Sequence, residues 1–344
     1  IINIMEQLNI FIPLFNIEVN EKFLDRPLFN DYKILKSSDI LYNIPQYVFA
    51  DEPFTKSFVR DISQNGINKI LLHPYAKFVL FKQISVNNEE QEFFQTKEKI
   101  KSEIDDILLS LRLVSNGFIQ INNCYFIGNG HSAYTQMKSS SQIENICISH
   151  RSRKNKLLCE NLYCLNEKCL KDALEIYSLI NNIKNKETMV VIEFFHKYFN
   201  SQTPYDKIIN LAIILESTML FGKNSELNYR LFLRTSTLLN KNVKDVLEVF
   251  YTIRSEVVHN GIIQERKNKK DIYAKVSNIT GIERDDYTEL IFYFIKDYIE
   301  PIIREIILKS FKIFASNSQI NSYDELNKDI DKFILDKISK DYSL

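Results

Sequence analysis

The sequence lacks a net charge, a disulfide framework and a long apolar run. Its 344 residues contain 44 Lys and Arg against 44 Asp and Glu, so any contact with RNA requires a local basic patch or a composite cleft. The odd number of cysteines, 5, fits reduced thiols in a cytoplasmic protein. No run of about 18 apolar residues is present, and residues 1–7 lack the basic and apolar regions of a secretion signal. We therefore expect a cytoplasmic protein without a membrane partner.

What is present is the composition of a globular protein with a core, 45% hydrophobic and 26% charged. The length favours two domains. Near residue 150 the pattern changes from mixed to helical, which predicts an α+β protein: a mixed α/β domain over residues 1–150, followed by an all-α helical bundle over residues 151–344. The residues of the first domain do not define its role, so sensing or gating of the second domain stays open.

In the N-terminal domain, the clearest element is a helix over residues 92–115, with its apolar residues on one face. Short apolar runs at 70–72 and 78–81 predict strands. Residues 118–121 and 124–127 predict a hairpin, because asparagines 122 and 123 tolerate the positive φ of a tight turn. Two further features are interpreted as turns rather than sites: His73 before a proline, and Gly128-Asn129-Gly130-His131, which lacks the spacing of a phosphate loop.

The helical region begins near residue 166. We expect a helix at 189–199, one that starts at Thr203-Pro204 and ends at Gly222, and one from Ser225 to about residue 240. A basic loop over 264–281 precedes a helix over 285–314 with a kink at Pro301. Ser322 and Glu325 form a capping box before the last helix.

Three features allow a functional and a structural interpretation. The basic run at 149–156 is a solvated linker or a strip that contacts phosphate, and we favour the linker. Cys159, Cys164 and Cys169 are buried thiols or zinc ligands, although zinc sites usually present a tighter cysteine pair. His196 lies in an apolar helix and is expected to be packed.

The residues that suggest a chemical function lie in the stretch 243–261. An apolar stripe of helical period runs through it, Asn242 is the predicted N-cap, and Gly261 favours a helix end there. Close to that end are Arg254, Ser255 and His259. The arginine fork suits phosphate oxygens and the histidine can give or take a proton, so together they can cleave RNA without a metal. On an ideal helix they lie about 140° apart, so they converge only if the last turn unwinds or two subunits build the site.

Neighbouring residues have two interpretations each. Glu216 is near the end of an apolar helix, where a carboxylate needs a partner, and we expect an ion pair with Arg230 or Arg254. This ion pair either has a structural role or orients Arg254. Ser255 binds phosphate or its own helix backbone. Asn260 contacts RNA or acts at the helix end.

Residues 253–261 resemble the Arg-x4-His ending of HEPN domains, in particular the Apea-like branch. Leu215-Glu216-Ser217 and Ser225-Glu226-Leu227-Asn228-Tyr229-Arg230 also resemble that branch, and the likeness covers about residues 200–315. It implies a metal-independent endoribonuclease that leaves a 2′,3′-cyclic phosphate, with Arg254 and His259 catalytic and Ser255, Glu216, Arg230 and Asn260 supporting.

The same resemblance implies a homodimer that acts on RNA, with tRNA as one candidate, in prokaryotic antiphage defence or a toxin system. No cofactor or metal is expected. The alternative is a non-catalytic HEPN-like module for dimerisation or for binding RNA or a nucleotide.

Overall fold

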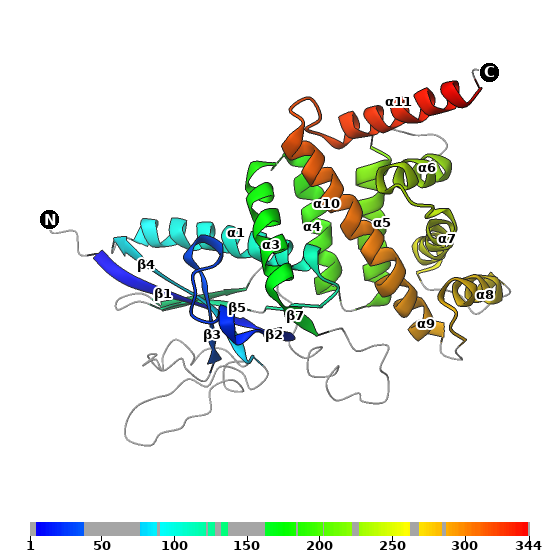
Figure 1. Cartoon of the computed structure of the whole chain (residues 1–344). Coiled ribbons are helices and arrows are strands. Elements are labelled where there is room, and N and C mark those ends of the chain that lie inside the picture. Colours follow the sequence, from blue (N-terminus) through cyan, green and yellow to red (C-terminus); the bar gives the residue numbers. More distant parts are fainter. Residues whose placement is uncertain are drawn as a thin grey trace. The chain divides into compact units, whose positions relative to one another are not determined.

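In a computed structural model, the described residues form two compact units (Figure 1). The described residues are 5–37, 76–87, 90–121, 123–127, 132–136, 162–183, 185–201, 203–221, 227–261, 268–283 and 287–342. Those up to 136, together with 162–177, belong to the first unit, and 178–342 belong to the second. The first unit contains an antiparallel sheet and the second is helical, which confirms the α+β class.

The first unit is built on a five-stranded sheet in the order β3-β4-β1-β5-β6, with every neighbouring pair antiparallel. The central strand β1 places Leu8, Ile10, Ile12 and Leu14 on the face toward the main core, and Phe11 on the opposite face packs with Val79 in a smaller cluster. The strands are β1 (Met5–Leu14), β3 (Lys33–Lys36), β4 (Phe78–Asn87), β5 (Asn123–Ile127) and β6 (Ser132–Gln136).

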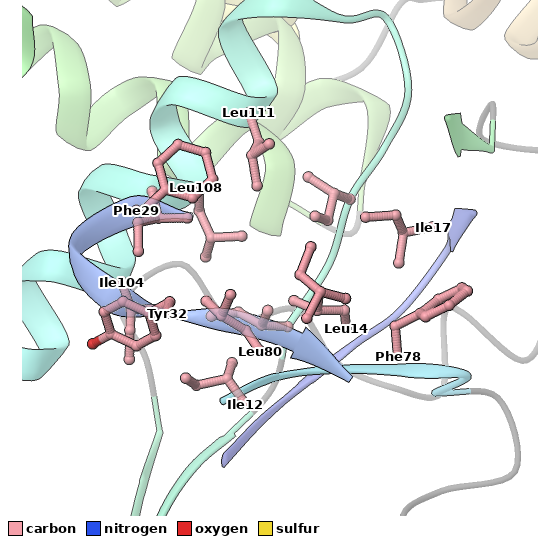
Figure 2. Packing of buried hydrophobic residues seen from close by; sticks show 14 of the residues in the cluster. Ile12, Leu14, Ile17, Phe29, Tyr32, Phe78, Leu80, Ile104, Leu108 and Leu111 are labelled. Carbon is pink, nitrogen blue, oxygen red and sulfur yellow. The ribbon is translucent and has the colours of Figure 1, made fainter. Parts of the chain in front are cut away.

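A second, parallel pair joins β2 (Ile17–Val19) to β7 (Tyr163–Leu165). The core of this unit lies between the sheet and α1 (Glu90–Val114), and the first part of α3 (Glu167–Asn182) also contributes to it. Figure 2 shows Ile104, Leu108 and Leu111 of α1 beside the strand residues. Thus β7 and the start of α3 complete the sheet unit.

The second unit is a set of helices, and side-chain caps mark the starts of α4 (Lys186–Asn200) and α5 (Pro204–Met219). Thr203 accepts from the Asp206 N–H and Pro204 occupies the first turn of α5, as the sequence predicts. Asn185 and Thr188 form a capping box at α4. The helices are α4 (Lys186–Asn200), α5 (Pro204–Met219), α6 (Leu227–Leu239), α7 (Lys244–Asn260), α8 (Asn268–Thr280), α9 (Tyr287–Phe294), α10 (Glu300–Ser316) and α11 (Tyr323–Tyr342).

A buried arginine connects three of these helices. Arg234 on α6 is 1% exposed, and its Nε and Nη2 each lie 2.7 Å from a carboxylate oxygen of Asp331 on α11. Its Nη1 donates to the Met219 carbonyl at the end of α5. A buried guanidinium requires such partners, because an unpaired charge in the core is strongly destabilising.

Two predictions about secondary structure are wrong. The hairpin at 118–121 and 124–127 does not form, since β5 pairs with β6 and Gln120 exchanges backbone hydrogen bonds with Phe15. Residues 118–121 are all buried, so they lack the alternation of a hairpin strand. Within the predicted loop at 264–281, residues 268–280 form α8, because Ile272, Tyr273 and Val276 are buried at helical spacing.

Other predictions hold in part. The helix over 285–314 divides into α9 and α10 around a π-helical segment, Ile295–Ile299, just before Pro301. Ser322 accepts from the Glu325 N–H, but Glu325 accepts from Asn321 rather than completing the box. The strand at 70–72, His73, residues 128–131, the basic run at 149–156, Cys159, Gly222 and Ser225 lie outside the described residues.

Candidate functional site

The predicted site stretch forms α7, whose buried face consists of Leu247, Phe250, Ile253 and Val257. The helix begins one residue later than predicted: Val243 is the N-cap, and the Asn242 side chain accepts from the Lys244 N–H at 3.2 Å. It ends at Gly261, as predicted. There a φ of 70° and a hydrogen bond from its N–H to the Val257 carbonyl close the last turn.

Arg254 is paired with Glu216 of the neighbouring helix α5. Its Nη2 lies 2.8 Å from Glu216 Oε1, and 30% of the arginine side chain and 34% of the glutamate side chain are exposed. This confirms the ion pair that the sequence predicts for Glu216 and identifies Arg254 as the partner. The pair joins the two helices at the edge of the bundle, where water still reaches both charges.

Tyr251, one turn before Arg254, completes the contact. Its hydroxyl donates to the same Glu216 oxygen at a long 3.4 Å. Burial raises the pKa of Tyr251, the Glu216 carboxylate adds to this, and Arg254 opposes it. The phenol therefore remains protonated at neutral pH and acts as a donor to Glu216.

A pocket of about 800 Å³ opens beside this group. It lies among the end of α5, the start of α6 and one face of α7. Its lining residues are Glu216, Leu220, Leu227, Asn228, Phe232, Glu248, Tyr251, Thr252, Arg254 and Ser255. Its volume falls within the range of about 300–1,000 Å³ of pockets that hold small organic ligands.

His259 does not line this pocket, and its side chain is exposed. Because α7 stays α-helical through Asn260, the last turn does not unwind to bring His259 toward Arg254. On a regular helix, however, His259 lies within about 40° of Glu248, Thr252 and Ser255 around the axis. It therefore belongs to the same stripe as these pocket residues, one turn beyond Ser255, whereas Arg254 lies about 100–160° away from them around the axis.

The other predicted site residues occupy different surroundings. Ser255 lines the pocket, and none of the described residues hydrogen-bonds to its hydroxyl. The Asn260 amide donates to Glu256 at 2.9 Å, one turn back on the helix. Arg230 lies 3.7 Å from Asp331, beside Arg234 rather than in the pocket. The structure thus brings together Arg254, Glu216 and Ser255.

Three residues of the pocket, Asn228, Phe232 and Glu248, were not predicted as site residues from the sequence. One signal was available for Glu248: it precedes Thr252 and Ser255 by four and seven residues, which is the spacing of one helix face. No comparable signal marks Phe232, because only the packing of α6 against α5 and α7 brings its ring to the pocket.

The described residues contain neither a candidate metal site nor a helix that could span a membrane. Within them, no group of three or more His, Cys, Asp and Glu side chains is arranged to hold a metal ion. Cys164 is exposed and Cys169 is half-buried. None of the described helices combines the length and apolar character needed to cross a bilayer.

No protein-family model, curated protein or solved structure matches this chain. The assignment of a function therefore rests on the residues of the pocket, on α7 and on the resemblance of the Arg-x4-His stretch.

Proposed function

We propose that the chain is a metal-independent endoribonuclease with Arg254 and His259 as its catalytic residues. The 2′-hydroxyl attacks the adjacent phosphorus and the bond to the 5′-oxygen breaks, which leaves a 2′,3′-cyclic phosphate and a 5′-hydroxyl. His259 moves a proton at the 2′-hydroxyl or at the leaving oxygen. Arg254 neutralises charge that builds on the phosphorane, and Ser255 positions a phosphate oxygen.

The observation that carries this proposal is the way Arg254 is held. Glu216 takes one amino group of the guanidinium, and within the described residues no other ion pair involves Arg254. A guanidinium has five N–H donors in a fixed fork, so donors remain for a phosphate at the pocket. An oriented arginine beside a free serine hydroxyl is the kind of anion site that the chemistry requires.

We further propose that two copies pair as a homodimer. Arg254 and His259 lie about 140° apart on one regular helix, so His259 of one copy can complete the site of the other. Pairing would also bring a second Arg254 into the same cleft, in a chain that is neutral as a whole.

The resemblance to Apea-like HEPN domains supports the same reaction. It extends the proposal to RNA cleavage in prokaryotic antiphage defence or a toxin system, with tRNA as one candidate substrate.

The test is incubation of the purified protein with tRNA and with mixed RNA in EDTA, followed by analysis of the RNA ends. Cleavage that persists in EDTA and leaves 2′,3′-cyclic phosphates is expected. Arg254→Ala should lower the rate by about 100-fold or more, and His259→Ala by about 100- to 10,000-fold. If the folded wild type cuts neither RNA, or if both variants cut like the wild type, the proposal is wrong.

The second candidate is a non-catalytic module that binds RNA or a nucleotide or mediates dimerisation. The Arg254–Glu216 ion pair favours this candidate, because a salt bridge between α5 and α7 gives both residues a structural role without catalysis. RNA binding that survives Arg254→Ala and His259→Ala, without cleavage by the wild type, would support this module.

A further inference from the structure

We infer that the pocket beside Arg254 seats a guanine base of the RNA, in a nucleotide directly next to the scissile phosphate. This rests on the proposed function and extends it to the specificity of the same site.

The pocket combines surfaces that a nucleobase needs. Leu220, Leu227 and the Phe232 ring provide an apolar wall, and a π-face next to aliphatic side chains suits a flat heterocycle. The Asn228 amide and the Thr252 and Ser255 hydroxyls provide polar groups for base edges and ribose. The Thr252 hydroxyl donates to the Glu248 carbonyl but can still accept from a ligand, and the Asn228 amide and the Ser255 hydroxyl can each donate and accept.

The two carboxylates of the pocket differ in their partners. Glu216 is held by Arg254 and Tyr251. The side chain of Glu248 is exposed, and among the described residues none pairs with its carboxylate; only its backbone carbonyl is engaged, by the Thr252 hydroxyl at 2.9 Å. Glu248 therefore has two acceptor oxygens available to a ligand.

An ionised carboxylate accepts hydrogen bonds and donates none. It fits a base edge that presents adjacent donors and is repelled by a carbonyl-rich edge. Guanine offers its N1–H and its amino group side by side, whereas uracil presents carbonyl oxygens on both sides of a single N–H. Glu248 therefore selects guanine over uracil. Cytosine and adenine each present one amino group, so their affinity for this carboxylate lies between those of guanine and uracil.

The order of side chains along α7 follows the order of groups in a nucleotide. Glu248 and Ser255 are separated by about 10 Å along the helix axis, with Thr252 between them. A base at Glu248 therefore leaves its ribose near Thr252 and its phosphate near Ser255 and Arg254.

The first measurement maps cleavage sites in a random RNA pool for the wild type, Glu248→Ala and Glu248→Gln. The wild type should cut next to guanosine with a preference of about tenfold or more over uridine, and both variants should lose that preference while they still cleave. Asp245→Asn, an exposed carboxylate in the first turn of the same helix, is the control and should retain the preference. Cleavage without any base preference, or a preference unchanged in both Glu248 variants, overturns the inference.

The second measurement does not depend on cleavage. Guanosine 3′- and 5′-monophosphate are titrated into the wild type and Glu248→Ala, with the uridine monophosphates as comparison. Guanosine nucleotides that bind about tenfold more tightly than uridine nucleotides, with the difference lost in Glu248→Ala, support the pocket even if no RNA is cut. Equal binding of both nucleotides overturns the inference, and cleavage in the first experiment then still leaves the ribonuclease proposal standing.

Discussion

Arg254 and Glu216 form an ion pair of 2.8 Å between α7 and α5 at the wall of the pocket. Each side chain is about one-third exposed, and an ion pair open to water adds little to folding stability. Its main physical effect is on geometry, since the carboxylate restricts which way the guanidinium fork points.

Replacement of Glu216 by glutamine tests this effect. Since the amide keeps the shape but loses the charge, we expect RNA cleavage to fall by up to about 100-fold, the scale of a misplaced catalytic group. The free energy of unfolding should change by less than about 1 kcal/mol. Glu305→Gln removes ion pairs with Lys241 and Lys309, away from the residues that line the pocket, and should leave the cleavage rate unchanged. A Glu216→Gln enzyme as fast as the wild type would assign the pair a structural role only.

Mixed dimers test whether two copies share one site. Arg254→Ala and His259→Ala are each expected to cleave slowly alone, but a heterodimer contains one site with both native residues if each site draws on both copies. Random exchange of subunits should then restore about a quarter of the wild-type activity. The measurement is cleavage after the two variants are mixed, with each variant mixed with itself as the control. No recovery, despite demonstrated subunit exchange, would mean that each site is built within one chain.

Arg234 should be highly sensitive to substitution, because its ion pair is buried. Arg234→Ala leaves Asp331 without its two closest hydrogen bonds and the Met219 carbonyl without its donor. The expected loss is about 3–5 kcal/mol of unfolding free energy, measured as a shift in urea unfolding followed by circular dichroism. Lys241→Ala removes an exposed ion pair and should cost less than about 1 kcal/mol. Similar losses in both variants would contradict the importance of burial.

Gly117 should not tolerate a side chain. A Cβ built there would lie 2.4 Å from Cα and 2.8 Å from Cβ of Tyr163 on β7, and backbone atoms cannot move aside as a flexible side chain can. Tyr163 is itself fixed by its hydroxyl, which donates to the Leu111 carbonyl at 3.0 Å. Gly117→Ala should therefore cost about 1–3 kcal/mol or more, measured by thermal unfolding. Asn116→Ala, at the exposed neighbouring position, serves as the control and should be close to the wild type.

The helices α5 and α7 were predictable because each segment carries its own signals. The apolar stripe and Gly261 defined α7, and Thr203 with Pro204 defined the start of α5, because capping and periodicity act over a few residues. The pairing of the strands could not be predicted in the same way. The segment at 118–121 has strand-forming residues, yet its backbone partner is Phe15, more than 100 residues earlier, and no local pattern encodes such a pairing.

For the candidate site, the sequence by itself determined that Arg254, Ser255 and His259 lie near one helix end and that Glu216 needs a cation. Helical period and the cost of a buried carboxylate are sufficient for both conclusions. Only the tertiary structure decided that the cation is Arg254 rather than Arg230, because Asp331 on α11 lies beside Arg230. It also created the pocket, since a cavity among α5, α6 and α7 arises from how the helices pack and not from any one of them.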